Sequence, residues 1–341
     1  MMATEEQKVN SYHGKGLTGL ANMGNTCFIN STMQCISHTY SLNDFLNKGE
    51  FKNKLNKKVD SLLLVEWNKL RQLMWSKNVT ISPGRFIKTI QHVSKEKNND
   101  LFSDFSQQDS AEFLIFCIEC FHNSIKKKQP VSYKNTKNKY LNKGYELTKS
   151  LYEKEYSSIH QLFHSIIINE IKSLEGKSLS IKAEHNLIFN LCFFKKTAHT
   201  LLECLDRYFS EELLENDNAW YNEKTKSKMS VYKSAKILYF PQIIIIDLKR
   251  WIDPFNKIKI KVDAPLLLDL SKYSVISTNN VIYELYGICN HKGGTMGGHY
   301  YANILNSNGN WYEINDTFIK NVESSKLVTP NAYCFFYRKK K

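Results

Sequence analysis

A cysteine near the start of the chain stands where nucleophilic chemistry is favoured. Cys27 ends a segment that is rich in small and turn-forming residues, 19–27 (GLANMGNTC), and a helical pattern begins at about Asn25. Asn25 or Thr26 can cap that helix. A thiol in the first turn of a helix has a lowered pKa, and the thiolate is the nucleophile. Taken alone, Cys27 could equally be a small buried side chain, so its assignment as a nucleophile depends on finding a base that pairs with it.

The best candidate for that base is His299, near the other end of the chain. It is one of ten histidines and follows the glycine-rich stretch 293–298. Such stretches let the backbone approach a ligand closely. His299 opens a β-rich run, 299–305, and a turn-like segment at 306–310 leads into a second run, 311–316.

The two runs predict a hairpin that brings an amide to the histidine. With the turn centred on Asn308, Tyr301 faces Asn315. Side chains alternate along a strand, so His299 shares a face with Tyr301 and has Asn315 as a diagonal neighbour. Asp316 is then expected on the other face, and a slip of one residue would exchange the two. The alternative interpretation is ordinary polar packing across a hairpin.

The elements that must position these residues form an α-rich half followed by a β-rich half, which predicts an α+β fold. Helices are expected from about residue 25, over 62–75 and from about 109, the last one ending in Lys126, Lys127 and Lys128, which suit the negative end of a helix. Residues 130–150 are polar and predict a loop. Strands are expected at 166–171, 187–193, 237–248 and within 281–305, with an amphipathic helix over 201–214.

Composition excludes several classes of protein. The 341 residues are 42% hydrophobic and 13% aromatic, which is too much core material for a disordered chain. No apolar run approaches the ~20 residues of a membrane span, and no secretory signal is visible at the start. We therefore expect a reducing, intracellular location (cytoplasm or nucleus) with free thiols among the eight cysteines, and no membrane partner. Five of them, Cys35, Cys192, Cys204, Cys289 and Cys334, are expected to be buried hydrophobes.

The formal net charge of +14 permits contact with nucleic acid. The lysines are scattered, however, so a solvated basic surface is the simpler interpretation and no nucleic acid is required.

With these residues in view, the chain resembles the ubiquitin-specific protease family of deubiquitinases. Segment 19–27 is similar to the cysteine box of that family, and 297–302 (GGHYYA) is similar to its histidine box. Further matches lie at 107–114 (QQDSAEFL), 248–251 (LKRW), 311–316 (WYEIND) and 332–337 (AYCFFY). The matches keep the order of the family from about residue 16 to 337.

The resemblance implies a papain-like cysteine protease fold with thumb, palm and fingers. It places a flexible lead at 1–15 and the catalytic domain at 16–341. Within that domain the thumb is expected at about 16–160, the fingers at about 161–240 and the palm at about 241–341 plus parts of the preceding region. It implies a monomer that cleaves the bond after the C-terminal glycine of ubiquitin, with ubiquitin and ubiquitinated proteins as partners.

The resemblance also assigns roles to individual residues. Cys27 is the expected nucleophile, His299 the base and Asn315 the residue that orients the imidazole. Asn22 and Asp316 match positions that assist the oxyanion. Contacts with the ubiquitin tail are expected from Asp109, Glu112, Gln108, Gly298 and Tyr300, where the simpler interpretation of the two carboxylates is favourable charge at a helix start.

Many family members bind zinc in the fingers through two Cys-x-x-Cys pairs. The corresponding positions here read SLEG at 173–176 and NEKT at 222–225, so all four sulfurs are missing. The one remaining pair, Cys117 and Cys120, lies in an apolar helix and is expected in the core. We therefore expect no metal and no cofactor. Two other functions stay open: a ubiquitin-binding pseudoenzyme, and a protease for another ubiquitin-like modifier.

Overall fold

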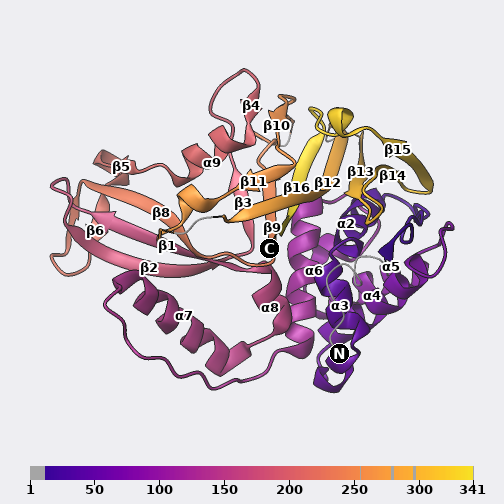
Figure 1. The fold of residues 1–341 in the computed structure, drawn as a ribbon, viewed down its shortest axis with the longest axis horizontal. Coiled ribbons are helices and arrows are strands. Elements are labelled where there is room, and N and C mark those ends of the chain that lie inside the picture. The colour runs from indigo at the N-terminus through magenta and orange to yellow at the C-terminus, as the bar shows by residue number, and fades with distance from the viewer. Residues whose placement is uncertain (1–11, 254, 278–279, 295–296, 341) are drawn as a thin grey trace.

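The computed structural model describes residues 12–253, 255–277, 280–294 and 297–340. Figure 1 shows the helices of the N-terminal part on one side of the molecule and two sheets beside them. The helices are α2 (Cys27–Ser37), α3 (Tyr40–Asn47), α4 (Asp60–Met74), α5 (Gly84–Glu96), α6 (Ser110–Ile125), α7 (Lys139–Glu155), α8 (Ser158–Phe163) and α9 (Leu201–Phe209). The strands are β1 (Ser165–Lys172), β2 (Ser178–Asn186), β3 (Ile188–Leu191), β4 (His199–Thr200), β5 (Glu212–Leu214), β6 (Trp220–Asn222), β7 (Ser227–Met229), β8 (Val231–Tyr239), β9 (Ile243–Leu248), β10 (Val262–Asp263), β11 (Leu267–Asp269), β12 (Ile282–Gly294), β13 (Gly297–Leu305), β14 (Trp311–Asn315), β15 (Phe318–Val322) and β16 (Ala332–Lys339). This arrangement is the predicted α+β class.

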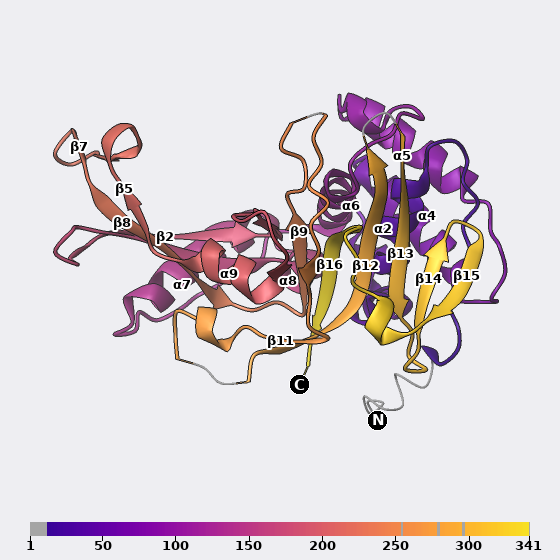
Figure 2. The ribbon, with the colours of Figure 1, turned by 90° about the horizontal axis from the view of Figure 1, so that it is seen from above.

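The larger sheet has the strand order β15-β14-β13-β12-β16-β9-β3, with β11 paired to β12. Its strand β9 is apolar along most of its length because both faces of the sheet are covered. Ile243 and Ile245 point into a core shared with the helices, whereas Ile244 and Ile246 point into a second core that includes Leu201 of α9. Figure 2 shows α2, α4 and α6 behind this sheet. The sheet is thus the layer that joins the two cores.

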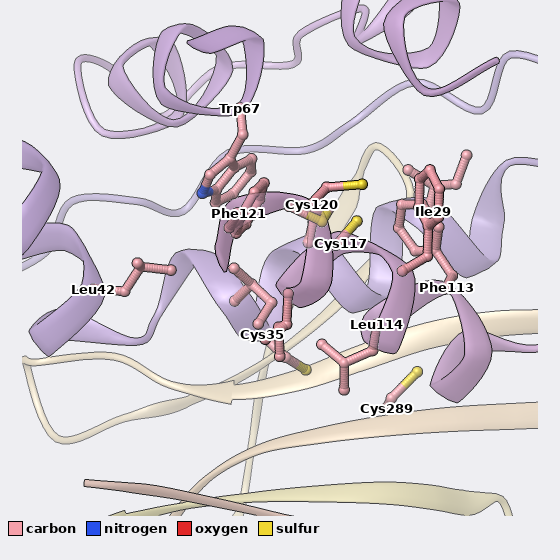
Figure 3. Packing of buried hydrophobic residues seen from close by; sticks show 14 of the residues in the cluster. Ile29, Cys35, Leu42, Trp67, Phe113, Leu114, Cys117, Cys120, Phe121 and Cys289 are labelled. Atoms are coloured by element: carbon pink, nitrogen blue, oxygen red, sulfur yellow. The ribbon is translucent and has the colours of Figure 1, made fainter. Parts of the chain in front are cut away.

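The core on the helical side is built around α6. Figure 3 shows Phe113, Leu114 and Phe121 of this helix beside Trp67 of α4 and Ile29 of α2. Cys117 and Cys120 are fully buried in the same cluster, as predicted for core cysteines.

The smaller sheet, β2-β1-β8-β5, extends away from the helices and has α7 along one face (Figure 1). The prediction of a loop over 130–150 is therefore wrong from Lys139 onward. Asn138 caps α7 by accepting hydrogen bonds from the backbone of the first turn. Polar contacts hold the helix to the sheet, since Lys139 and Tyr140 both bind the carboxylate of Glu170 on β1. The segment does carry apolar side chains at helical spacing (Tyr140, Leu141, Leu147 and Leu151), and the prediction followed its polar composition instead.

Several predicted boundaries also need correction. Helix α6 ends at Ile125, so Lys126, Lys127 and Lys128 lie beyond it and not in its last turn. Helix α9 ends at Phe209, and the predicted remainder up to Leu214 forms strand β5. The predicted strand 237–248 is two strands, β8 and β9, separated at Phe240–Gln242.

Smaller differences concern the start of the chain and the cysteines. The predicted lead 1–15 lies outside the described residues up to residue 11. Tyr12, however, is 5% exposed and stacks on Tyr40, so it belongs to the folded body. The eight cysteines are free, and Cys192 is exposed where a buried side chain was expected.

Candidate active site

Cys27 is the first residue of α2 and is 4% exposed. Helix α2 contacts β13, the strand that carries His299. The segment before Cys27 is held against the residues that follow Asn315: the backbone N–H of Leu20 donates to the carbonyl of Asp316 at 2.9 Å. Gly19 permits this approach, because a Cβ there would lie 2.7 Å from backbone atoms of Thr317. Two segments that are far apart in the sequence, 19–20 and 316–317, therefore meet close to Cys27.

The environment of the Cys27 thiol differs from the prediction. Burial raises its pKa, and the nearby Asp316 carboxylate adds to that rise, while the backbone N–H of Tyr300 opposes it. The expected fall in pKa at a helix start is thus outweighed by burial. The predicted cap is also wrong in detail: Thr26 precedes the helix, but its side chain makes no capping bond to it. The hydroxyl of Thr26 instead accepts from the backbone N–H of Met23.

The predicted register of the β13–β14 hairpin is confirmed. Ala302 pairs with Ile314 and Leu305 with Trp311, which centres the turn on Asn308. Nε2 of His299 lies 2.6 Å from Oδ1 of Asn315. An amide oxygen only accepts hydrogen bonds, so Nε2 is the protonated nitrogen and Nδ1 is left as the basic one.

Asp316 does not lie on the opposite face, as alternation predicted. Strand β14 ends at Asn315, and Asp316 adopts a left-handed φ of 50°, which turns its side chain back toward the site. Its Oδ2 lies 3.9 Å from Nε2 of His299 and accepts from Nδ2 of Asn22 at 3.1 Å. Its Oδ1 accepts from Nδ2 of Asn30 at 2.8 Å.

Asn22 is exposed and bridges the loop that leads to Cys27. Its Oδ1 accepts from the backbone N–H groups of Gly24 and Thr26, at 3.1 and 3.2 Å. Together with the bond to Asp316, these contacts fix the amide beside the cysteine. Asn30 completes the set and was missed as a site residue. The available signal was a polar side chain one helical turn after the candidate nucleophile Cys27, and the structure shows that this helix is buried throughout.

The residues expected to contact a substrate tail lie at the start of α6. Asp109 is its N-cap, and one carboxylate oxygen accepts from the backbone N–H groups of Ala111 and Glu112. The other oxygen accepts from the hydroxyl of Tyr333. The simpler interpretation, a structural role at a helix start, therefore accounts for the contacts that Asp109 makes in this structure. Glu112 is exposed and Gln108 half-buried.

Gly298 and Tyr300 flank the histidine on β13. A Cβ at Gly298 would overlap Nε2 of His291 on β12, so a larger residue there would displace the His291 ring. Tyr300 is 8% exposed, and its backbone N–H faces the thiol of Cys27. Tyr300 thus acts through its backbone and its packing, and its ring is not on the surface.

The turns that correspond to the zinc-binding pairs hold no metal-ligating set. At 173–176 the turn closes on itself, with the N–H of Ser173 donating to the carbonyl of Lys177 at 2.8 Å. In the second turn, Asn222 accepts from the N–H of Lys224, and Thr225 contacts Ser227. Within the described ranges no group of three or more His, Cys, Asp or Glu side chains is arranged to hold a metal ion. Nor does any helix of those ranges have the length and apolar character needed to cross a membrane.

Comparison with known proteins decides the family. The family model described as "Ubiquitin carboxyl-terminal hydrolase" matches residues 18–337. The chain belongs to the ubiquitin carboxyl-terminal hydrolase family. Ubiquitin carboxyl-terminal hydrolase 2 from Bos taurus is 31% identical over 344 residues, covering 96% of this chain and 56% of that protein. Ubiquitin carboxyl-terminal hydrolase Usp2 from Drosophila melanogaster is 32% identical over 334 residues, covering 95% of this chain and 35% of the relative.

This family member thus spans from about a third to about half of the length of those two relatives. Among solved structures, the SAGA Ubp8/Sgf11/Sus1/Sgf73 DUB module bound to ubiquitin aldehyde matches with a TM-score of 0.74 and 23% identity. That match covers 100% of this chain and 72% of the other. A further SAGA DUB module structure matches with a TM-score of 0.71 and 22% identity. These likenesses confirm the predicted fold of the family's catalytic domain.

Proposed function

We propose that this chain is a cysteine-dependent deubiquitinase that hydrolyses the bond after the C-terminal glycine of ubiquitin. The observation that carries the proposal is the pair formed by His299 and Asn315 on the strands packed against the helix of Cys27. Membership of the hydrolase family supports the same assignment.

In this proposal Nδ1 of His299 takes the proton of the Cys27 thiol, and the sulfur attacks the carbonyl carbon of the terminal glycine. Asn315 holds the imidazole in the tautomer that this step needs, as an orienting group does in other triads. The imidazolium then returns the proton to the departing amine as the C–N bond breaks. Water hydrolyses the thioester that remains and regenerates the thiol.

The oxyanion of the tetrahedral intermediate needs donors that are already in place. Asn22 is the side chain we assign to this role, because its amide is fixed next to Cys27 by contacts to Gly24, Thr26 and Asp316. Asp316 supports it by accepting from Nδ2 of Asn22, which orients the amide group. Asp316 therefore contributes through position, and its own charge disfavours an adjacent anion.

For substrate binding we assign the ubiquitin tail to the region of Asp109, Glu112 and Gln108, with Gly298 and Tyr300 lining the approach to Cys27. Glu112 is the accessible carboxylate of this group, so it is the best placed for an arginine of the tail. Because Asp109 is engaged by Tyr333 and the helix backbone, we infer that it mainly shapes the site.

We assign the helices of 16–160 to the thumb and the four-stranded sheet within 161–240 to the fingers. The larger sheet, formed by strands of 241–341 together with β3 of the preceding region, is assigned to the palm. We further infer that the chain acts as a monomer inside the cell, with ubiquitin and ubiquitinated proteins as its partners and without nucleic acid.

The decisive experiment is labelling with ubiquitin that carries a C-terminal electrophile. The wild-type chain should form a covalent adduct, and Cys27→Ala should form none while keeping its melting temperature within about 2 °C. Cys192→Ala, which removes an exposed cysteine, is the matched control and should label like the wild type.

Adduct formation that persists in Cys27→Ala, or that moves to Cys35, contradicts the assignment of the nucleophile. Binding of ubiquitin without any adduct in the wild type would support a pseudoenzyme. Faster reaction with an electrophile made from another ubiquitin-like modifier would change the substrate and leave the chemistry in place.

A further inference from the structure

Lys257 lies in the turn that connects β9 to β10, outside the residues assigned to catalysis. The turn is closed at its base by a bridge between Trp251 and Lys257, and the side chain of Asp253 accepts from the backbone of Phe255 and Asn256. Below it, Arg250 is buried and donates to backbone carbonyls on both sides of the connection, those of Ala332, Ile258 and Ile260. The hydrogen bonds of Arg250 therefore fix the backbone on both sides of this turn.

The ammonium group of Lys257 lies 5.8 Å from the ring centroid of Trp251, and both of its hydrogen-bond contacts are with His291. Its Nζ lies 2.6 Å from Nδ1 of His291 and donates to the carbonyl of the same residue at 2.7 Å. Lysine has no acceptor, so Nδ1 of His291 must be unprotonated, and the neutral ring carries its proton on Nε2. The lysine thus fixes both the charge and the tautomer of this histidine.

His291 in turn lies against the strand end that carries the proposed base. It pairs with Tyr300 across β12 and β13, and the two rings are 4.4 Å apart between centroids. Its Nε2 occupies the space that a Cβ at Gly298 would need. His299 stands between these two neighbours, and the backbone N–H of Tyr300 faces the Cys27 thiol.

We propose that Lys257 is a positioning residue for the catalytic histidine, holding His291 and through it the strand end at Gly298 and His299. This inference rests on the proposed function, since it concerns the geometry of the same reaction. Without the lysine, His291 loses the donor to its Nδ1, and its ring is free to rotate or to take up a proton next to His299. Either change displaces the imidazole, and misplacement by about 1 Å can cost about a hundredfold in rate.

The charge of Lys257 provides a second measurable quantity that tests the proposal, namely the pKa of His291. Burial, the cation of Lys257 and the neighbouring ring of His299 lower the pKa of His291 to about 4. Removing the cation should raise that pKa, because a like charge next to an imidazolium disfavours it. At a given acidic pH a larger fraction of His291 would then be protonated beside His299.

The test compares Lys257→Met with Lys257→Arg, which keeps a charged donor. In Lys257→Met we expect kcat on a ubiquitin C-terminal amide to fall about tenfold or more, with KM within about twofold, and the acid limb of the kcat profile to move to higher pH. NMR titration of the histidine rings, with His291→Gln to assign the signal, should show the pKa of His291 raised by about half a unit or more. Lys257→Arg should restore most of both quantities.

Lys259→Met is the matched control, because Lys259 is exposed on the same connection. It should leave kcat within about twofold of the wild type. The proposal is overturned if Lys257→Met leaves the His291 pKa and kcat unchanged, or if kcat falls with no change in either the pH profile or the His291 titration. The histidine titration needs no substrate, so it still tests the contact if the wild type proves not to react with ubiquitin.

Discussion

Asn30 of helix α2 donates a hydrogen bond of 2.8 Å to the carboxylate of Asp316, which lies 286 residues further along the chain. Asn30 is one turn after Cys27, and Asp316 follows Asn315 directly. This single bond therefore ties the helix of the proposed nucleophile to the hairpin of the proposed base. In its left-handed backbone conformation, Asp316 accepts from both Asn22 and Asn30 through the two oxygens of its carboxylate.

Replacing Asn30 by Ala should weaken both folding and catalysis. The change removes the donor to a half-buried carboxylate, and a lost hydrogen bond to a charged group costs about 1.5–3 kcal/mol. We expect that loss in the free energy of unfolding, measured with urea, and a fall of about tenfold or more in kcat.

Asn43→Ala provides the comparison, because Asn43 is as deeply buried in α3 and donates to the carbonyl of Ser37 away from the site. It should lose comparable stability and keep kcat. Equal effects of the two variants on kcat would show that the Asn30–Asp316 bond has no particular role in catalysis.

Asn315→Ala should lower turnover while ubiquitin binding is kept. Without the amide oxygen, Nε2 of His299 loses its acceptor at 2.6 Å, and the Asp316 carboxylate at 3.9 Å is too distant for a hydrogen bond. The fraction of rings in the reactive tautomer and orientation therefore falls. We expect kcat to decrease about tenfold or more and the affinity of the catalytically inactive Cys27→Ala background for ubiquitin to stay within about twofold when Asn315→Ala is added. A loss of affinity without a loss of turnover would be incompatible with an orienting role.

Asp316→Asn tests the neighbouring residue through the thiol. The Asp316 carboxylate raises the pKa of Cys27, so its neutral replacement should lower that pKa. The pH profile of alkylation of Cys27 by iodoacetamide, measured in Cys192→Ala protein, should therefore move to lower pH. A shift to higher pH would mean that Asp316 stabilises the thiolate through its hydrogen-bond network.

The four-stranded sheet should be stable without zinc. A structural zinc site contributes about 10–16 kcal/mol of apparent binding energy in small zinc domains, so its absence must be offset by other contacts. Here α7 lies along the sheet, and Glu170 of β1 accepts from Lys139, Tyr140 and Ser178. Metal analysis should find less than one zinc per chain, and a strong chelator should leave activity and melting temperature unchanged. Inactivation by the chelator would reveal a ligand set that the sequence does not suggest.

The contacts of the candidate site could be predicted from the sequence more completely than the bounds of the helices and strands. The segment 306–310 around Asn308 consists of Asn, Ser and Gly, which are typical turn residues, and side chains alternate between the two faces of the strands on both sides. The register and the His299–Asn315 contact therefore follow from local rules. Asp316 could not be placed in this way, because the strand ends one residue before it and its conformation depends on Asn22 and Asn30, which are distant in sequence.

Helix α7 and the pKa of the Cys27 thiol are two further features that the sequence analysis did not predict. The polar composition of 139–155 conceals a helix whose apolar side chains do recur at helical spacing, and whose attachment to the sheet includes polar contacts to Glu170. The rise in the pKa of Cys27 comes from burial under β13, which depends on tertiary packing and not on the position of the residue in its helix.

Four histidines should make the folded state sensitive to weak acid. His122 of α6, His160 of α8, His164 just after it and His185 of β2 meet where the helices adjoin the smaller sheet. The rings of His160 and His164 stack at 3.9 Å, and that of His185 lies 4.5 Å from His160. They border a cavity of about 450 Å³ whose wall also includes Glu119 and Glu155, the latter paired with Lys126.

Burial, together with the mutual repulsion of neighbouring rings, lowers the pKa of His160 to about 2 and that of His164 to about 4, and burial alone lowers the pKa of His185 to about 4. Burial also lowers the pKa of His122. The unfolded chain, with histidine pKa values near 6.5, takes up protons first as pH falls. Stability is therefore complete above about pH 6.5 and is lost below it, at up to about 1.4 kcal/mol per pH unit for each histidine, until the folded-state pKa is reached.

Replacing His160 by Phe keeps an aromatic ring in the stack and removes one titrating group. The free energy of unfolding, measured with urea between pH 7.5 and 4.5, should then fall less steeply in the variant than in the wild type, by up to about 1.4 kcal/mol per pH unit. The same replacement at the exposed His92 of α5 serves as the control and should keep the wild-type slope. Parallel pH profiles for the wild type and His160→Phe would show that His160 takes up its proton equally well in the folded and unfolded chains, contrary to its burial in the cluster.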